Sequence, residues 1–262
     1  TAKCPIWDKF MNEIFAGNRN IIGYMQRKAG YILTGLTGEE EVDILYGVGG
    51  NGKSKYIGQI THIMGDYAVK TNIETIQATK NRNGSAPSPD VVDLKGARLV
   101  TCSEPDMNTR LNESRIKDWT GRDPIKARGL NEKPIQFFPE FKLMIYTNYP
   151  LTIIGTDKGI RRRLKQIPFE VVIKELDKDI NLDKKLLTES SGILNWMIEG
   201  YLEYQKGGLQ VPEEIVKATA DYMNEQDTYA EFINICCLKI PKEEEDTWGI
   251  TSFKKLFETF KL

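Results

Sequence analysis

Four residues in the first quarter of the chain have the types and the spacing of a phosphate-binding loop. Gly47, Gly52, Lys53 and Ser54 fit the pattern G-x-x-x-x-G-K-[ST] within the stretch GVGGNGKS. Glycines in such a loop let the backbone approach phosphates closely, and backbone N–H groups at the start of the following helix point at the anion. The lysine reaches the β- and γ-phosphates, and the serine hydroxyl binds Mg²⁺. The pattern therefore predicts a site for a nucleoside triphosphate.

The flanking residues supply the strand and the helix that this loop requires. Residues 42–46 are a short apolar run, and apolar residues recur at helical spacing after the loop until Gly65. We expect a buried strand at 42–46 and a helix over 53–64, although a glycine-rich turn that only starts a helix is the alternative. The predicted nucleotide contacts are Gly47, Gly49, Gly50, Asn51, Gly52, Lys53, Ser54 and Lys55.

An acidic partner for the metal and the attacking water is expected at the end of a neighbouring strand. The stretch ARLVTCSE, residues 97–104, is a buried strand that ends in Ser103 and Glu104. We predict that Glu104 polarises the attacking water and that Ser54 and Glu104 bind the metal, while Ser103 and water complete the metal shell. Asp106 is a candidate helper. A strand end without a catalytic role is the alternative for Glu104.

A third buried strand, FKLMIYTN at 141–148, ends in Asn148. An asparagine at this place can hydrogen-bond both the γ-phosphate and the attacking water. Asparagine is also common in turns after strands, so a plain turn is the alternative.

Three consecutive arginines, Arg161, Arg162 and Arg163, lie beside a fourth predicted buried strand, RRLKQIPFEVVI at 162–173. The permanently charged, planar guanidinium fork suits phosphate, and an arginine supplied by a neighbouring subunit neutralises charge in the transition state. A solvated basic turn is the alternative.

The middle of the chain is basic although the whole chain is not. Between Arg110 and Lys165 there are 13 Lys/Arg and 6 Asp/Glu, whereas the formal net charge of the chain is −1. Residues 124–138 in this region are typical of two short strands around a glycine-containing turn with basic residues near its tip. Such a basic hairpin favours a polyanionic partner, and a solvated surface is the alternative.

Composition and length restrict the class of protein. The 262 residues are 40% hydrophobic and 28% charged, enough for one α/β domain with a helical appendage. We find no membrane-length apolar run, no signal peptide and no metal-ligand spacing among the four cysteines and His62, which predicts a cytoplasmic protein without a zinc site. Because the first residue is Thr1, we also expect a piece of a longer protein.

Strands alternating with helices predict a parallel sheet flanked by helices, as in P-loop NTPases. We expect a small N-terminal helical segment at 1–36, a nucleotide-binding core at 37–175 with the hairpin at about 124–138, and a C-terminal helical region at 176–262.

The order of these motifs resembles the superfamily III helicase domain, of AAA+ type, found in phage and plasmid primase–helicases and their poxvirus relatives. GVGGNGKS, LVTCSEPD, DWTGRDPIKAR, FKLMIYTN and GTDKGIRRRLKQIPF follow one another as in that family. The resemblance implies an ATP- and Mg²⁺-dependent motor that translocates on single-stranded DNA during replication of a phage, virus or mobile element. It also implies a homo-oligomeric ring, usually a hexamer, and a primase or polymerase domain in the full-length chain.

The resemblance assigns a role to several residues. It implies catalysis by Lys53, Glu104 and Asn148, and it points to Arg162 as the arginine finger with Arg163 as the neighbouring candidate. Lys126, Arg128 and Lys133 on the channel-facing hairpin would meet DNA phosphates. Three features depart from the family: Arg161 where relatives often have an aromatic residue, a leucine at the hairpin apex, and an end at TSFKKLFETFKL, where a winged-helix-like domain would begin.

Two other functions fit a phosphate loop. A P-loop kinase or GTPase is one, although the chain lacks the base-reading N/T-K-x-D motif of GTPases. A nucleotide-dependent DNA-loading module with little hydrolysis is the other, against which the intact Lys53, Ser54 and Glu104 argue.

Overall fold

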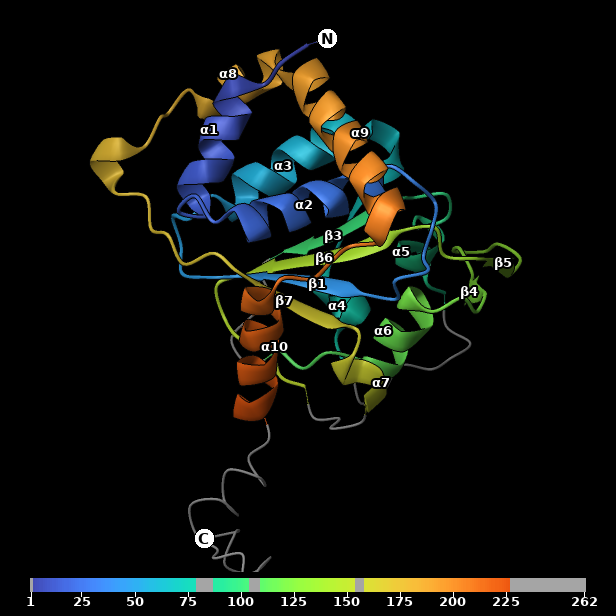
Figure 1. The fold of residues 1–262 in the computed structure, drawn as a ribbon. Helices are drawn as coiled ribbons and strands as arrows, with labels where there is room; N and C mark the ends of the chain where they lie inside the picture. The colour runs from blue at the N-terminus through green and yellow to red at the C-terminus, as the bar shows by residue number, and fades with distance from the viewer. Residues whose placement is uncertain (1, 79–86, 104–108, 154–157, 227–262) are drawn as a thin grey trace, which may run out of the picture.

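The chain folds around a five-stranded parallel sheet in the order β2-β3-β6-β1-β7 (Figure 1). The computed structural model describes residues 2–78, 87–103, 109–153 and 158–226. The sheet strands are β1 (Val42–Tyr46), β2 (Ala68–Thr71), β3 (Leu99–Ser103), β6 (Lys142–Thr147) and β7 (Leu164–Pro168). The predicted α/β fold with a parallel sheet is confirmed.

Four of these strands follow from the apolar runs in the sequence, whereas β2 was not predicted. Two of its four residues are half-buried, one is exposed and one is buried, and the strand lies at an edge of the sheet beside β3. A short edge strand with one neighbour does not need a continuous apolar run, so its sequence carries little signal.

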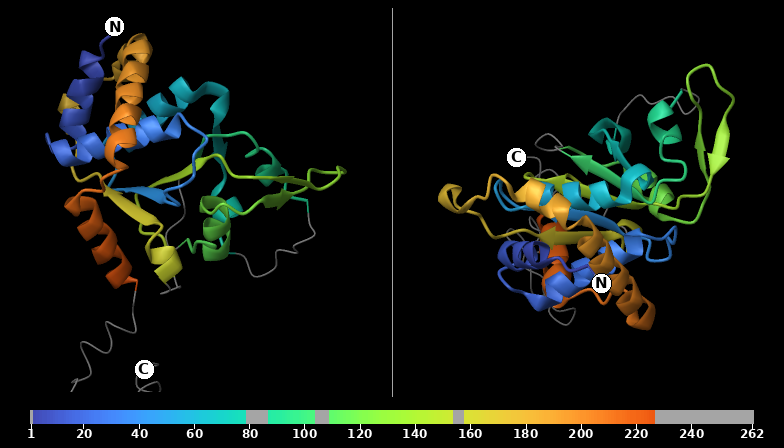
Figure 2. Two further views of the ribbon diagram at one scale, coloured as in Figure 1. Left: turned by 45° about the vertical axis from the view of Figure 1, so that its right-hand side comes forward. Right: turned by 90° about the horizontal axis from the view of Figure 1, so that it is seen from above.

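Helices cover both faces of the sheet (Figures 1 and 2). In Figure 1, α1 (Pro5–Ile14), α2 (Arg19–Ile32), α3 (Lys53–Met64), α8 (Leu182–Thr188) and α9 (Ser190–Gly207) lie above it. Below it lie α4 (Ile73–Ile76), α6 (Glu113–Thr120), α7 (Lys158–Arg161) and α10 (Glu213–Glu225). The remaining short helices are α5 (Pro89–Val92), η1 (Gly65–Tyr67) and η2 (Glu175–Asp177).

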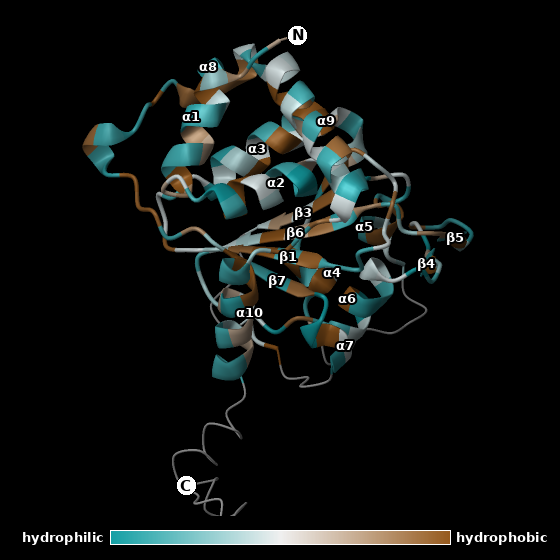
Figure 3. Cartoon of the chain, in the orientation of Figure 1, coloured by the Kyte–Doolittle hydropathy of each residue, from teal (hydrophilic) through white to brown (hydrophobic). Residues whose placement is uncertain are grey.

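Each face of the sheet has its own hydrophobic core, because successive residues of a strand point to opposite faces. Leu45, Met144 and Ile167 belong to the core under α1, α2, α3 and α9, whereas Ile44 and Ile145 belong to the core that includes residues of α6 and α10. Figure 3 shows the hydrophobic residues concentrated on the strands and on the helix faces turned toward them. Burial on both faces explains why these strands are continuous apolar runs.

The N-terminal and C-terminal helical segments pack on each other through a glycine contact between α2 and α9. A Cβ atom added to Gly30 would lie 2.1 Å from the backbone nitrogen of Tyr201, and one added to Gly200 would lie 2.0 Å from the carbonyl oxygen of Gln26. The two helices therefore touch backbone to backbone, and segments about 170 residues apart in the sequence form one layer.

A buried charge cluster joins α2 to the strand that leads into the phosphate loop. Lys28 Nζ lies 3.0 Å from Asp43 Oδ1 and 2.8 Å from Glu41 Oε2, and both Lys28 and Asp43 are almost fully buried. Burial alone lowers the pKa of Lys28, but the two carboxylates raise it well above its usual value. The lysine therefore stays charged and fixes α2 against β1.

The hairpin expected near 124–138 is present as an antiparallel pair. Strands β4 (Ile125–Ala127) and β5 (Ile135–Phe137) pair with Lys126 opposite Gln136, and both views in Figure 2 show the pair extending away from the body of the molecule. Its buried side consists of Ile125, Ala127 and Phe137, whereas Lys126 and Gln136 are exposed.

Within the described part of the chain, none of the helices has both the length and the apolar character that crossing a membrane demands.

Candidate functional site

The predicted phosphate loop, residues 47–54, connects β1 to α3 at the carboxyl end of the sheet. Strand β1 ends at Tyr46 and α3 begins at Lys53, with Gly52 as its N-cap. Gly50 and Gly52 adopt left-handed backbone conformations with φ of +77° and +85°, which glycine adopts at little cost. The sequence thus predicted both boundaries of the loop helix, since α3 also ends at Met64 before Gly65.

Close packing explains two of the glycines in the loop. A Cβ atom on Gly47 would lie 2.2 Å from the carbonyl oxygen of Phe169, and a Cβ atom on Gly52 would lie 2.5 Å from Cγ2 of Ile14. A Cβ atom on Gly49 would have no heavy atom within 4 Å. Gly47 and Gly52 are therefore required by the surrounding protein, whereas Gly49 faces open space.

The Lys53 side chain is folded against its own loop. Its Nζ donates hydrogen bonds to the carbonyl oxygen of Gly47 at 2.6 Å and to Asn51 Oδ1 at 2.9 Å. Lys53 is only 4% exposed, and burial lowers the pKa of its ammonium group to about 8. Among the described residues, the hydrogen-bond partners of Lys53 Nζ are neutral oxygen atoms, so an anion at this place would stabilise the charge.

The start of α3 fits the phosphates of a nucleotide. The first N–H groups of a helix have no partner within the helix, and within the described part of the chain no side chain caps the N-terminus of α3. Ser54 in its first turn is exposed, so its hydroxyl can reach a metal ion. The donors present are the uncapped N–H groups, the Lys53 ammonium group and the Ser54 hydroxyl, which together suit a triphosphate with Mg²⁺.

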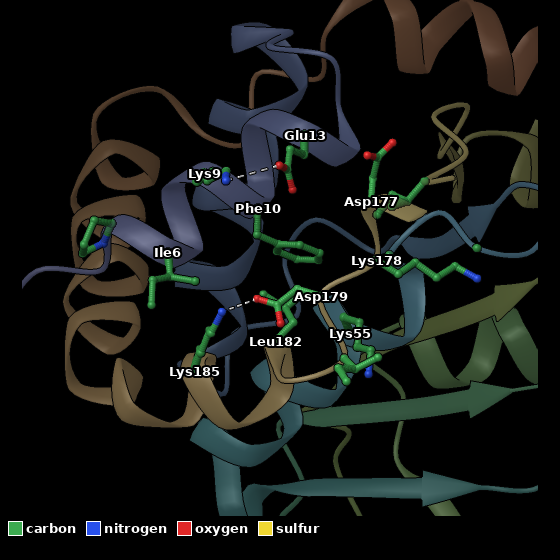
Figure 4. A pocket seen from close by; sticks show the side chains of 15 residues that line it. Ile6, Lys9, Phe10, Glu13, Lys55, Asp177, Lys178, Asp179, Leu182 and Lys185 are labelled. Atoms are coloured by element: carbon green, nitrogen blue, oxygen red, sulfur yellow. Dashed lines mark hydrogen bonds and ion pairs between the residues drawn. The ribbon is translucent and has the colours of Figure 1, made fainter. Parts of the chain in front are cut away.

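A cavity of about 750 Å³ opens beside the phosphate loop (Figure 4). Its wall includes Gly50 and Gly52 from the loop, Phe10 from α1, and Ile180 and Leu182 from the segment that follows β7. In Figure 4 the ring of Phe10 points into the space between α1 and that segment. A volume in this range is typical of small-molecule sites, so the cavity has room for a base and a sugar next to the phosphates.

The segment 169–182, which we call the arm, is tied to the phosphate loop by hydrogen bonds. Asn51 Nδ2 donates to the carbonyl oxygen of Phe169 at 3.0 Å, and the backbone N–H of Ile173 donates to the carbonyl oxygen of Gly50 at 2.9 Å. Farther along, Lys185 Nζ binds Asp179 Oδ2 at 2.6 Å. These bonds fix the arm beside the phosphate loop. Residues of the arm and of α1 line the two sides of the cavity.

Two predicted catalytic residues, Asn148 and Glu104, follow strands that end at the same carboxyl end of the sheet as β1. The structure describes Asn148 but not Glu104. Asn148 directly follows β6, the neighbour of β1, and is exposed. Tyr46 pairs with Thr147, so Asn148 and the phosphate loop leave adjacent strands at the same level. Strand β3 ends at Ser103 on the same edge, but Glu104 and Asp106 lie outside the described residues.

The arginine run, Arg161–Arg163, lies at the amino-terminal ends of the strands, whereas the phosphate loop lies at their carboxyl-terminal ends. It immediately precedes β7, and Leu164 at the start of β7 pairs with Val42 at the start of β1. With a rise of about 3.3 Å per residue, the five residues of β7 place the arginine run roughly 16 Å from the phosphate loop of the same chain. An arginine side chain cannot bridge that distance.

The structure distinguishes the two candidate arginines. The side chain of Arg162 is 66% exposed, whereas that of Arg163 is 10% exposed. Arg163 donates from Nε to Thr120 Oγ1 at 3.1 Å and from Nη1 to the carbonyl oxygen of Gly159 at 3.0 Å. Both arginines also bind Glu40. Arg163 thus makes several bonds within the chain, whereas Arg162 reaches the surface.

The predicted DNA-binding residues differ in exposure. Lys126 and Lys133 are exposed on the hairpin, whereas Arg128 is half-buried. The backbone of Arg128 is held by Ser88, whose N–H donates to the Arg128 carbonyl oxygen at 2.8 Å. Leu130 at the turn is 70% exposed, so the turn offers apolar surface beside the exposed charges of Glu132 and Lys133.

Reasoning from the sequence missed the part that α1 and the arm play beside the phosphate loop. The N-terminal stretch was expected only as a helical segment, and the residues after β7 carried no recognised motif. A signal was present, because the N-terminal helix has an amphipathic pattern whose buried side includes Phe10. That pattern predicts burial but does not identify the neighbouring element.

Comparison with known proteins gives one family and several viral relatives. Residues 45–163 match a family described as a family of unknown function, DUF5906. The chain is 29% identical over 246 residues to "Putative helicase L207/L206" of Acanthamoeba polyphaga mimivirus, covering 87% of this chain and 26% of that protein. It is 25% identical over 236 residues to "Putative helicase 022R" of Frog virus 3, covering 83% of this chain and 24% of that protein.

A further viral relative matches a shorter part of the chain. "Putative primase C962R" of African swine fever virus (strain Badajoz 1971 Vero-adapted) is 30% identical over 139 residues, covering 52% of this chain and 14% of that protein. The chain thus spans about a quarter or less of the length of these viral proteins.

Among solved structures, the apo form of the NrS-1 C-terminal region, residues 305–718, has the same fold. The TM-score is 0.62 at 14% identity, and the match covers 99% of this chain and 62% of that one. This similarity supports the fold alone. Taken with the viral matches, it shows that this chain is a distant homologue of viral proteins named as helicases and primases, with an α/β fold shared with the NrS-1 region.

Proposed function

We propose that the chain is an ATP-dependent DNA helicase motor of the superfamily III type, which moves along single-stranded DNA during replication of a DNA virus or a related element. The proposal rests on the names of its distant viral homologues and on the phosphate loop. The observation that carries it is the position of the exposed Arg162, which lies at the edge of the sheet opposite its own phosphate loop. A complete site would then form between two copies of the chain.

In this proposal the phosphate loop binds ATP with Mg²⁺. The uncapped N–H groups of α3 and the Lys53 ammonium group bind the phosphates, and the Ser54 hydroxyl lies on the metal. The cavity between α1 and the arm takes the base and the sugar. The bound metal supplies Lewis-acid stabilisation of the phosphates.

Hydrolysis needs an activated water and a neutralised transition state. We assign the water to Glu104, which follows Ser103 in the sequence, and to Asn148, which follows β6. Strands β3 and β6 both end at the edge that carries the phosphate loop. Arg162 of a neighbouring copy supplies the positive charge. We do not assign that role to Arg163, because its guanidinium group already binds Thr120, Gly159 and Glu40.

The hairpin is the proposed DNA contact. Lys126 and Lys133 present two exposed positive charges on an element that extends from the body of the molecule. Contacts of this kind bind the phosphates of single-stranded DNA without reading sequence, and their strength falls with salt. ATP-dependent movement of the hairpins in a ring would then carry the strand.

The test is ATP turnover per subunit across a concentration series, with and without single-stranded DNA. We expect the specific activity to rise with protein concentration and again with DNA, and Lys53→Ala to abolish it. A mixture of Lys53→Ala and Arg162→Ala chains should regain turnover, because one chain supplies the intact phosphate loop and the other supplies the arginine. Activity that is independent of concentration, DNA and mixing would contradict a shared site.

A further inference from the structure

The carboxylate of Glu40 connects the exposed Arg162 to the buried Arg163. Its Oε2 atom lies 3.1 Å from Nη2 of Arg162 and 2.8 Å from Nη2 of Arg163. One oxygen atom therefore accepts from the buried guanidinium group and from the exposed one. Glu40 comes from the segment between α2 and β1, more than 120 residues away in the sequence.

Arg163 is a fixed support for this carboxylate. Its side chain is 10% exposed, and its Nε and Nη1 atoms donate to Thr120 Oγ1 and to the carbonyl oxygen of Gly159. These bonds leave Nη2 directed at Glu40. The Glu40 carboxylate is thus held by the guanidinium group of Arg163, which two further hydrogen bonds fix in place.

The backbone at Glu40 is in an unfavourable conformation. Its φ angle is +52°, and the turn is closed by a hydrogen bond from its N–H to the carbonyl oxygen of Thr37 at 3.2 Å. A left-handed conformation is unfavourable for a residue with a Cβ atom, because the Cβ atom comes too close to the following carbonyl oxygen. Residues that retain such strain often do so where the exact position of a side chain matters for function.

We infer that Glu40 is the positioning residue of Arg162, holding its guanidinium group ready for the phosphates of the neighbouring copy. This inference rests on the proposed function of Arg162. A freely moving arginine side chain loses rotamer entropy when it is fixed. An anchored carboxylate imposes part of that order before the subunits meet, and such pre-organisation speeds a reaction that depends on alignment.

A purely structural role for Glu40 predicts a different outcome. In that case the carboxylate only balances the buried charge of Arg163, and its removal would lower stability without a specific effect on turnover. Replacement of Glu40 by glutamine keeps the size and one acceptor oxygen but removes the charge. The neighbouring Glu39 provides a matched control, since Glu39→Gln removes the same charge from the same segment and Glu39 Oε1 contacts Tyr204 instead of an arginine.

We expect Glu40→Gln to lower kcat for ATP by about 10- to 100-fold, as misalignment of a catalytic group does. KM and the melting temperature should stay close to those of the Glu39→Gln chain. Mixing Glu40→Gln chains with Lys53→Ala chains should restore turnover, since the latter carry an intact Glu40 and Arg162.

The outcomes separate this inference from the proposed function. If Arg162→Ala abolishes turnover but Glu40→Gln equals the Glu39→Gln control, Glu40 does not position the arginine and only this inference fails. No rescue by Lys53→Ala chains would likewise assign Glu40 a structural role. Full activity of Arg162→Ala would instead refute the proposed role of that arginine.

Discussion

The backbone N–H of Val42 donates a hydrogen bond to the carbonyl oxygen of Arg163 at 2.8 Å. This bond aligns the arginine run with the first residue of β1, whereas the phosphate loop follows the last residue of the same strand. The two charged elements are therefore separated by the full length of a strand. The position of Arg162 suits action on a neighbouring copy, and the following predictions test this and other features of the site.

The first prediction separates the two candidate arginines. Arg162→Ala should abolish turnover while nucleotide affinity and melting temperature change little, because its side chain is mostly exposed. Arg163→Ala should lower the free energy of unfolding by about 2–4 kcal/mol, because it removes the hydrogen bonds of a buried guanidinium group to Thr120, Gly159 and Glu40. Chemical denaturation and nucleotide titration measure both effects. Equal loss of stability in the two variants would contradict this division.

The second prediction concerns two glycines of the phosphate loop. Gly47→Ala should destabilise the chain by about 1–3 kcal/mol, because the new methyl group would collide with the carbonyl oxygen of Phe169. Gly49→Ala should leave the free energy of unfolding nearly unchanged, because the added atom meets open space at an ordinary φ angle. Denaturation of the two variants without nucleotide makes the comparison direct. A larger loss for Gly49→Ala would show that the packing around the loop is different.

The third prediction concerns the hairpin. Lys126→Ala and Lys133→Ala should each weaken binding to single-stranded DNA and reduce the slope of log affinity against log salt by roughly 0.7, as expected for the loss of one phosphate contact. Lys206→Ala is the control with the same charge change, because Lys206 lies on α9, where the proposal places no DNA contact. Fluorescence anisotropy over a salt series measures affinity and slope together. Equal effects of all three variants would indicate general attraction by net charge.

The fourth prediction links nucleotide binding to protons. Burial lowers the pKa of Lys53 to about 8, and phosphate oxygens would raise it again. Below pH 8 the lysine already carries its proton, so pH should affect affinity little through this group. Above pH 8 binding must take up a proton, so affinity should fall as pH rises, by up to about tenfold per pH unit.

Calorimetry at pH 9 in two buffers with different ionisation enthalpies measures this proton uptake. Lys53→Arg is the matched control, because arginine keeps its charge at this pH and should take up no proton. The same uptake in both chains would mean that another group is responsible.

The local elements around the phosphate loop were predictable because their signals are local. A buried strand needs a short apolar run, and a helix needs apolar residues at three- and four-residue spacing, so the sequence predicted both the 42–46 strand and the 53–64 helix with their observed bounds. The hairpin at 124–138 was predictable for the same reason. The edge strand β2 was missed, because a half-buried strand of four residues has no such pattern.

The sequence by itself determined that Lys53 follows a glycine loop at a helix N-terminus. Strand, loop and helix are consecutive in the chain, and each can be recognised from the local spacing of its own residues. Only the tertiary structure decided that Arg162 lies at the opposite edge of the sheet and that Glu40 holds it against Arg163. It also decided that α1 and the arm form the cavity beside the loop. These relations join residues more than 100 positions apart, and packing of the sheet and its helices, rather than local spacing, brings them together.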